Sequence, residues 1–176
     1  MTPGAVVINE IHLNPDVKIE QVEFIELHNT GEQPVDLSGW KLENAVQFTF
    51  PFGSSIPARG FTVVAHQPDQ FKAKFGGQAL GPWIGKLNND GERIELRALD
   101  GQLVDRIRYR LGFPWPVVGD TPGYSIELIH PDLDNNDGHN WKASVRGDAS
   151  NKANRLIRRG SPVSYTHLTL PTKRIV

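Results

Sequence analysis

The chain has 176 residues, no cysteine, and a formal net charge of −1 from 19 basic and 20 acidic residues. The lack of cysteine excludes disulfides, thiolate metal sites and cysteine nucleophiles. The balanced charge argues against a dedicated binder of nucleic acid or membrane surfaces, because such proteins usually carry a clear basic excess. The length suits one domain with a substantial core, which we expect over residues 1–161.

Short runs in which apolar and polar residues alternate are separated by seventeen glycines and thirteen prolines. Many short alternating runs between frequent turns predict an all-β sandwich or barrel. One stretch, 68–76, is spaced like a helix, with Phe71 and Phe75 four residues apart and Gly76 at its end. The predicted strands are VVINEI (6–11), EFIELHN (23–29), VQFTF (46–50), GFTVVAH (60–66), ERIELRA (92–98), LVDRIRYR (103–110) and YSIELIH (124–130).

The run EFIELHN is the strongest candidate for chemistry, because it holds two carboxylates and a histidine within six positions. Strand alternation gives the two facial sets Phe24, Glu26, His28 and Glu23, Ile25, Leu27. The three polar groups therefore do not share a face. The favoured interpretation is an ordinary strand with Glu23 as a surface or edge group. A functional pair of Glu26 and His28 is the alternative, because perturbed groups cluster at sites.

The dipeptide Asp100-Gly101 between two alternating runs is typical of a β-hairpin. A two-residue turn would place Ala98 opposite Leu103, Ile94 opposite Ile107, and Glu95 opposite Arg106. The apolar face would then consist of Ile94, Leu96, Leu103, Ile107 and Tyr109. Asp105 falls on this face, and the pattern indicates no partner for it.

The same hairpin carries a row of arginines: Arg106, Arg108 and Arg110 on one strand, beside Arg93 and Arg97 on the other. A basic stripe can neutralise phosphates, so a nucleic-acid-contacting module is one alternative function. A solvated sheet face, partly balanced by Glu95, is the simpler interpretation.

The acid-rich stretch HPDLDNNDGHN (130–140) offers the oxygen ligands that calcium prefers. The candidate metal ligands are Asp132, Asp134, Asn136 and Asp137. The glycine comes one position late for the helix-loop-helix calcium pattern, and no glutamate closes the loop. A plain turn is favoured, since Asp and Asn side chains bond nearby backbone. A weak calcium site is the alternative, and no other cofactor is expected.

Two tryptophans, Trp83 in GPWIG and Trp115 in FPWPVVGD, stand among prolines and glycines and are therefore expected on loops. Exposed aromatic rings could stack on sugars, so a carbohydrate-binding module using these two residues is a second alternative function. Covering the open end of a sandwich is the commoner use of such residues. No nucleophile elbow, phosphate loop or zinc-type spacing is present, so the sequence predicts no enzyme.

In their order and spacing, the motifs from residue 6 to about residue 155 resemble a lamin tail domain of the bacterial type. The matching features are N-E-I (9–11), E-F-I-E-L-x-N (23–29), D-L-S-G-W (36–40), the P-x-G turn (51–53) before V-V-A (63–65), the D-G hairpin and N-W (140–141). Lys152-Ala-Asn154 stands where the family closes with Pro-Gly-x-x-Asn.

The resemblance implies an immunoglobulin-like β-sandwich and a non-catalytic structural or interaction role, with no catalytic residues to assign. Glu10, Glu26 and Asn29 match family positions where a polar group is expected to bond backbone near a sheet edge. Trp40 and Trp141 fall in family motifs and are expected in the core.

Similar domains in bacteria occur mainly in secreted or surface proteins, beside hydrolases, nucleases or kinase-like domains, which they tether. The resemblance therefore implies a secreted or cell-surface location, with other domains of the same polypeptide or a cell-surface component as partners. The start MTPGAVVINEI has no features of a signal peptide, so we expect any signal to lie upstream. No apolar run is long enough to span a membrane.

The last residues, VSYTHLTLPTKRIV (163–176), have no counterpart in the family. They resemble a translated sequencing adapter of the transposase type, because one reading frame of that adapter encodes VSYTHLTLPT. We therefore expect 162–176 to be a non-native tail and the chain to be a fragment of a larger protein.

Overall fold

The computed structural model describes residues 6–110, 112–117 and 122–144, and the predicted adapter-derived tail lies outside them. Each of the seven predicted runs contains a strand, and the helix forms where it was expected. The elements in chain order are β1 (Val6–His12), β2 (Phe24–Asn29), β3 (Val35–Asp36), β4 (Lys41–Asn44), β5 (Val46–Thr49), β6 (Ser55–Ile56), β7 (Phe61–Ala65), α1 (Pro68–Phe75), β8 (Ile84–Gly85), β9 (Arg93–Arg97), β10 (Leu103–Arg108), β11 (Ile126–Leu128), the 3-10 helix η1 (Gly138–Asn140) and β12 (Trp141–Ala143).

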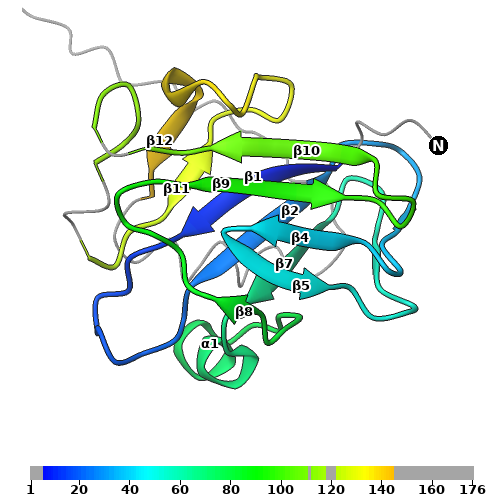
Figure 1. Cartoon of the computed structure of the whole chain (residues 1–176), viewed down its shortest axis with the longest axis horizontal. Helices are drawn as coiled ribbons and strands as arrows, with labels where there is room; N and C mark the ends of the chain where they lie inside the picture. The colour runs from blue at the N-terminus through cyan, green and yellow to red at the C-terminus, as the bar shows by residue number, and fades with distance from the viewer. Residues whose placement is uncertain (1–5, 111, 118–121, 145–176) are drawn as a thin grey trace, which may run out of the picture.

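The strands form two five-stranded antiparallel sheets, which confirms the predicted all-β sandwich (Figure 1). The first sheet has the order β12-β11-β1-β2-β7 and the second β10-β9-β4-β5-β8, while β3 and β6 make a separate pair. The five strands that the sequence did not predict, β3, β4, β6, β8 and β12, have two to four residues each. Runs this short are too brief to show alternation.

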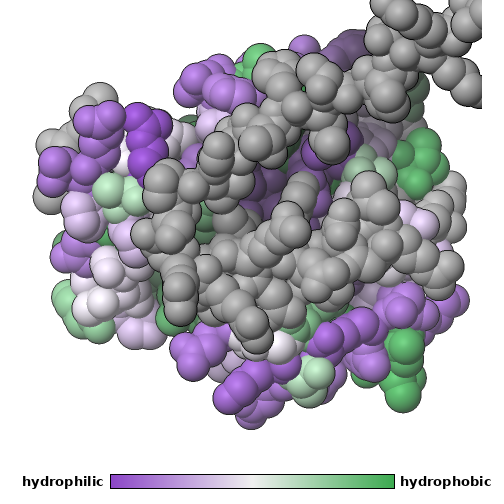
Figure 2. All heavy atoms as spheres, turned by 180° about the vertical axis from the view of Figure 1, so that it is seen from behind, coloured by the Kyte–Doolittle hydropathy of each residue, from purple (hydrophilic) through white to green (hydrophobic). Residues whose placement is uncertain are grey.

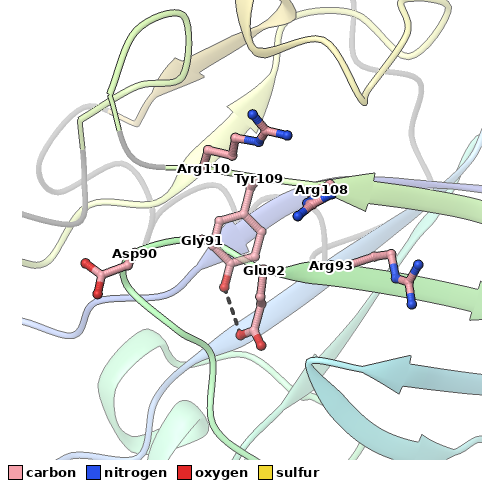
Figure 3. A pocket seen from close by; sticks show the side chains of 7 residues that line it. All are labelled: Asp90, Gly91, Glu92, Arg93, Arg108, Tyr109 and Arg110. Carbon is pink, nitrogen blue, oxygen red and sulfur yellow. Dashed lines mark hydrogen bonds between the residues drawn. The ribbon is translucent and has the colours of Figure 1, made fainter.

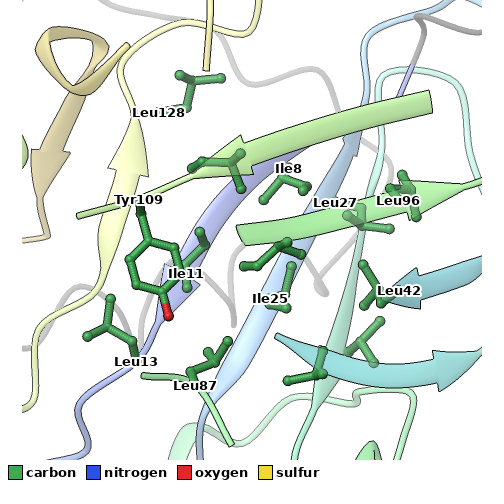
Figure 4. Packing of buried hydrophobic residues seen from close by; sticks show 14 of the residues in the cluster. Ile8, Ile11, Leu13, Ile25, Leu27, Leu42, Leu87, Leu96, Tyr109 and Leu128 are labelled. Atoms are coloured by element: carbon green, nitrogen blue, oxygen red, sulfur yellow. The ribbon is translucent and has the colours of Figure 1, made fainter. Parts of the chain in front are cut away.

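The main core fills the space between the two sheets (Figure 4). From the first sheet, Ile8, Ile25 and Leu27 point inward and are fully buried; from the second, Leu42 and Leu96 meet them. Burying aliphatic side chains of this size stabilises a fold by about 1.5–3 kcal/mol each. On β2 the inward residues follow the strand period of two, whereas on β1 a bulge between Ile8 and Glu10 shifts the inward set to Ile11.

Helix α1 covers part of the outer face of the first sheet and creates a second, smaller core. Phe71 and Phe75 on α1 pack edge-on against Phe24 of β2, with ring centroids 5.3 and 5.7 Å apart. Pro68 starts the helix and Gly76, with φ of 75°, ends it in the left-handed conformation that favours glycine. No helix in the described ranges is long and apolar enough to cross a membrane.

The β9–β10 hairpin differs from the prediction near its turn. Leu103 pairs with Arg97 instead of Ala98, because the turn takes one more residue. A one-residue bulge at Val104 then restores the expected register, with Arg106 opposite Glu95 and Ile107 opposite Ile94. Leu103 was expected on the apolar face but is 37% exposed. The remaining predicted members of that face, Ile94, Leu96, Ile107 and Tyr109, are buried.

Candidate functional site

The run EFIELHN lies on β2, where its polar groups bond in different directions. Glu26 accepts a hydrogen bond from Asn9 Nδ2 of the neighbouring strand β1 at 2.9 Å. His28 stacks on Phe61 of β7, with ring centroids 4.1 Å apart, and burial lowers its pKa to about 4. The two share a face as predicted, but these contacts give each a separate packing role.

Asn29 at the end of β2 has the structural role that the family resemblance implied. Its amide Nδ2 donates to the carbonyl oxygens of Gln33 and Pro57, at 2.8 and 3.0 Å, and its Oδ1 accepts from the Gly31 backbone at 2.9 Å. The side chain is fully buried. It therefore joins the end of the first sheet to the segments that form β3 and β6.

Three buried carboxylates lie directly opposite one another on the outer face of the first sheet, because Glu10 of β1 pairs in register with both Glu26 of β2 and Glu127 of β11. Glu10 Oε1 accepts from the Ser125 hydroxyl at 2.5 Å, and Lys142 Nζ lies 3.4 Å from Glu127 Oε2. Glu10 and Glu26 thus bond to side chains on inner strands of the sheet and not at its edge, where the polar groups were expected. Figure 2 shows the opposite side of the molecule from Figure 1, where hydrophilic residues lie at the upper left and along the lower edge, the end at which α1 lies.

Glu23 is not the surface group that the sequence suggested, because it is only 1% exposed. Its Oε2 accepts from the Leu87 backbone N–H at 3.1 Å, and His66 Nδ1 lies 3.9 Å away. Its Oε1 has no hydrogen-bond partner among the described residues. Burial raises the pKa of Glu23 to about 7. The sequence missed this because the covering residue, Leu87, lies 64 positions further along the chain.

Glu23→Gln should become more stable relative to the parent protein as pH rises from 5 to 8. The folded pKa is raised above the ordinary value of 4.5. The neutral group therefore contributes stability at low pH that is lost as pH rises through about 7, while glutamine stays neutral throughout. We expect a relative gain of about 2–3 kcal/mol, measured by urea unfolding at both pH values. Glu32→Gln, at an exposed position, is the control; an equal difference at both pH values would contradict the assignment.

Of the proposed calcium ligands, Asp134 and Asp137 form hydrogen bonds within their own loop, and Asp132 Oδ2 lies 3.6 Å from His130 Nδ1. Asp134 Oδ1 accepts from the Asn136 backbone, and Asp137 Oδ1 caps the short helix η1 by accepting from the His139 backbone. Asn136 Oδ1 accepts from the Arg108 backbone at 2.8 Å, which ties this loop to the end of β10. In the described ranges no group of three or more His, Cys, Asp or Glu side chains is placed to hold a metal ion.

Millimolar calcium should leave the melting temperature of the protein unchanged. A ligand that binds the native state raises the melting temperature, and these oxygens are already engaged in turn and cap hydrogen bonds. Thermal unfolding followed by circular dichroism, with and without calcium, measures this. A rise of several degrees that disappears in Asp134→Ala would establish a calcium site there, with Asp69→Ala on α1 as the control for the lost charge.

Trp83 and Trp115 lie in loops, as predicted, but belong to the main core, with 3% and 6% of their surface exposed. Trp115 packs on Trp141, with ring centroids 6.0 Å apart, and Trp83 is stacked with His66. This is the arrangement of residues that close the ends of a sandwich. Neither ring presents a face to solvent on which a sugar could stack.

The outer face of the second sheet carries five arginines. Two lie on β9, two on β10 and one just after β10. We call this set the arginine face: Arg93, Arg97, Arg106, Arg108 and Arg110. Glu95, which was expected to balance it, lies 2.6 Å from Arg97 and 3.4 Å from Arg93. In the part of the chain that the structure describes, Arg106, Arg108 and Arg110 form no ion pair, so the face keeps positive charge that its own carboxylates do not balance.

A cleft of about 560 Å³ opens at one end of the arginine face (Figure 3). It is lined by Asp90, Gly91, Glu92, Arg93, Arg108, Tyr109 and Arg110. The Tyr109 hydroxyl lies 2.9 Å from Asn88 O and 3.1 Å from Glu92 Oε1, and burial raises the pKa of this tyrosine. Clefts of about 300–1,000 Å³ are typical of small-ligand sites.

Gly91 packs against the backbone of Tyr109 and Arg110, the second segment that lines the cleft. A Cβ atom at this position would come within 2.6 Å of Tyr109 O and 2.7 Å of Arg110 Cα, and the φ of 109° also favours glycine. Sequence reasoning found the arginines but not Asp90, Glu92 or the cleft itself. The available signal was the turn Asn88-Asn-Asp-Gly-Glu92, which marks a loop and does not show where the loop lies.

The family model described as Lamin Tail Domain matches residues 1–110, which include β2 and both strands of the arginine face. The search of curated proteins found no match to the chain.

Proposed function

The chain belongs to the lamin tail domain family, and we propose that it is a non-catalytic interaction domain that tethers a larger secreted or cell-surface bacterial protein. The domains of this family have an immunoglobulin-like fold, which suggests an interaction role, and the two-sheet sandwich agrees with that fold. The proposal assigns no catalytic residues and places the interaction on a sheet face.

The observation that carries this proposal is the positive charge of the arginine face. Arg106 and Arg108 on β10 and Arg110 just after it are exposed, and none of the three has an ion pair among the described residues. Three like charges at alternating positions repel one another. A partner with negative groups would remove that repulsion, so the face is suited to binding rather than to folding.

Retention on cell envelopes tests the proposal. A fluorescent reporter fused to the N-terminus of the full chain is mixed with isolated bacterial envelopes and centrifuged. The fusion should sediment with the envelopes, whereas the reporter alone should stay in the supernatant. If the two distribute alike on envelopes from Gram-positive and Gram-negative cells, the tethering function is wrong.

A further inference from the structure

On one side of the cleft, arginine side chains without an ion pair among the described residues are free to bind an anion. Arg93 and Arg108 lie directly opposite each other in the β9–β10 pairing, and like charges in that position are destabilising. Arg93 has partners in Glu95 and in Asn44 Oδ1 at 3.2 Å. Arg108 and Arg110 have no ion pair within the described residues, so their guanidinium groups remain available. A planar carboxylate matches a guanidinium through two parallel hydrogen bonds.

The opposite side of the cleft offers acceptors instead of donors. Asp90 lines the cleft on the other side of Tyr109 from Arg93 and Arg108, with its carboxylate turned outward, and Glu92 lies at the Tyr109 hydroxyl (Figure 3). Asp90 is exposed and has no ion pair in the part of the chain that is described. Ionised carboxylates accept hydrogen bonds from hydroxyl groups but repel other anions. Any polyanion meets this repulsion, but a polymer with several free hydroxyl groups on each unit can offset it with hydrogen bonds to the carboxylate, whereas DNA has few such groups.

A ligand that fits both sides carries one carboxylate and several hydroxyl groups on a compact ring. We infer that the cleft binds a sugar acid, within a polysaccharide of the uronic acid type. This inference rests on the proposed tethering function and specifies its partner as an acidic glycan. Arg108 and Arg110 hold the carboxylate, and Asp90 accepts from the hydroxyl groups.

Titration calorimetry of the full chain with polygalacturonate tests this inference. Dextran is the neutral comparison and duplex DNA the phosphate comparison. We expect heat of binding with polygalacturonate, none with dextran, and weaker binding with DNA. Binding to DNA that exceeds binding to polygalacturonate and falls steeply with salt would overturn the inference in favour of a nucleic-acid surface.

Four substitutions separate the cleft from general charge attraction. Arg108→Gln and Arg110→Gln should each weaken binding to polygalacturonate about tenfold, since each removes a charged bidentate donor. Arg106→Gln changes the same charge on the same strand but lies outside the cleft, so its loss should be clearly smaller. Arg59→Gln, at an exposed position paired with Glu32, should bind like the parent protein.

Asp90→Ala distinguishes a sugar acid from a phosphate polymer by the sign of its effect. Removing an acceptor for hydroxyl groups should weaken binding to polygalacturonate about threefold. Removing a negative charge should strengthen binding to DNA. Unchanged melting temperatures would show that the variants are folded. Gly91→Ala is not used, because an added Cβ would clash with the neighbouring backbone and could unfold the protein.

The outcomes separate this inference from the tethering function. Retention of the fusion on envelopes without binding to polygalacturonate, or equal losses in Arg106→Gln and Arg108→Gln, would overturn the sugar-acid site and leave tethering intact. Absence of both retention and polymer binding would overturn both. If Arg108→Gln loses both retention on envelopes and binding to polygalacturonate, the result supports the tethering function and the sugar-acid site.

Discussion

Asp105→Ala is expected to lower the free energy of unfolding by about 2–5 kcal/mol, the largest effect of any polar substitution considered. Asp105 Oδ2 accepts from the Ile8 backbone N–H at 2.7 Å and from Asn135 Nδ2 at 2.6 Å. Ile8 and Asn135 are both buried. Alanine at position 105 would therefore leave two N–H donors without an acceptor, and water could not reach them to replace it. Each buried donor without a partner costs about 1–3 kcal/mol.

This effect is large because Asp105 connects three parts of the fold. Its carboxylate joins β10 of the second sheet to β1 of the first and to the loop before η1. Denaturant titration of Asp105→Ala measures the loss. Asp100→Ala is the control, because that side chain accepts from the Gln102 backbone in the exposed hairpin turn. If the two variants lose the same small amount, Asp105 does not hold the sheets together.

We expect the parent protein to lose stability as pH falls from 6.5 to 4, and we expect His12→Phe to lose less. His12 is 1% exposed and is stacked on Phe24, with ring centroids 5.3 Å apart. Burial, with the nearby Lys74 charge, lowers its pKa from 6.5 to about 4. The unfolded chain therefore takes up a proton at a higher pH than the folded chain does. The stability is present above pH 6.5 and is lost as pH falls towards 4, by about 3 kcal/mol.

The measurement is urea unfolding of both proteins at pH 7.5 and pH 4.5. At pH 7.5 they should be similar, because phenylalanine can occupy the same place between Phe24 and Phe75. At pH 4.5 the variant should be clearly the more stable. His28, whose pKa is also lowered, acts in the same direction, and Glu23 acts in the opposite direction, but both are present in the two proteins. A constant difference between the two proteins at both pH values would show that His12 does not titrate in this way.

Much of the fold could be predicted because its signals are local. Alternation with a period of two selects the inward residues of β2, such as Ile25 and Leu27, whatever lies against them. Pro68 and Gly76 mark the helix by their own backbone preferences. For the candidate site, the same alternation placed Arg106, Arg108 and Arg110 on one face and Glu95 opposite Arg106.

The ion pairs of that face could not be predicted. Register suggested Glu95 with Arg106, but Glu95 pairs with Arg93 and Arg97 on its own strand. Residues two apart on a strand share a face, so a long arginine side chain can reach a carboxylate along the strand as well as across it. The choice depends on competing partners, which the pattern does not rank.

The sequence by itself determined the sandwich, its helix and the arginine-bearing strands, because periodicity and turn chemistry act within a few residues. Only the tertiary structure decided the burial of Glu23 under Leu87, the partners of Asp105, and the cleft made where Gly91 meets the end of β10. Each of these depends on contacts between segments far apart in the chain. A bulge at Val104 and a close backbone approach at Gly91 place those segments, and neither leaves a periodic signal in the sequence.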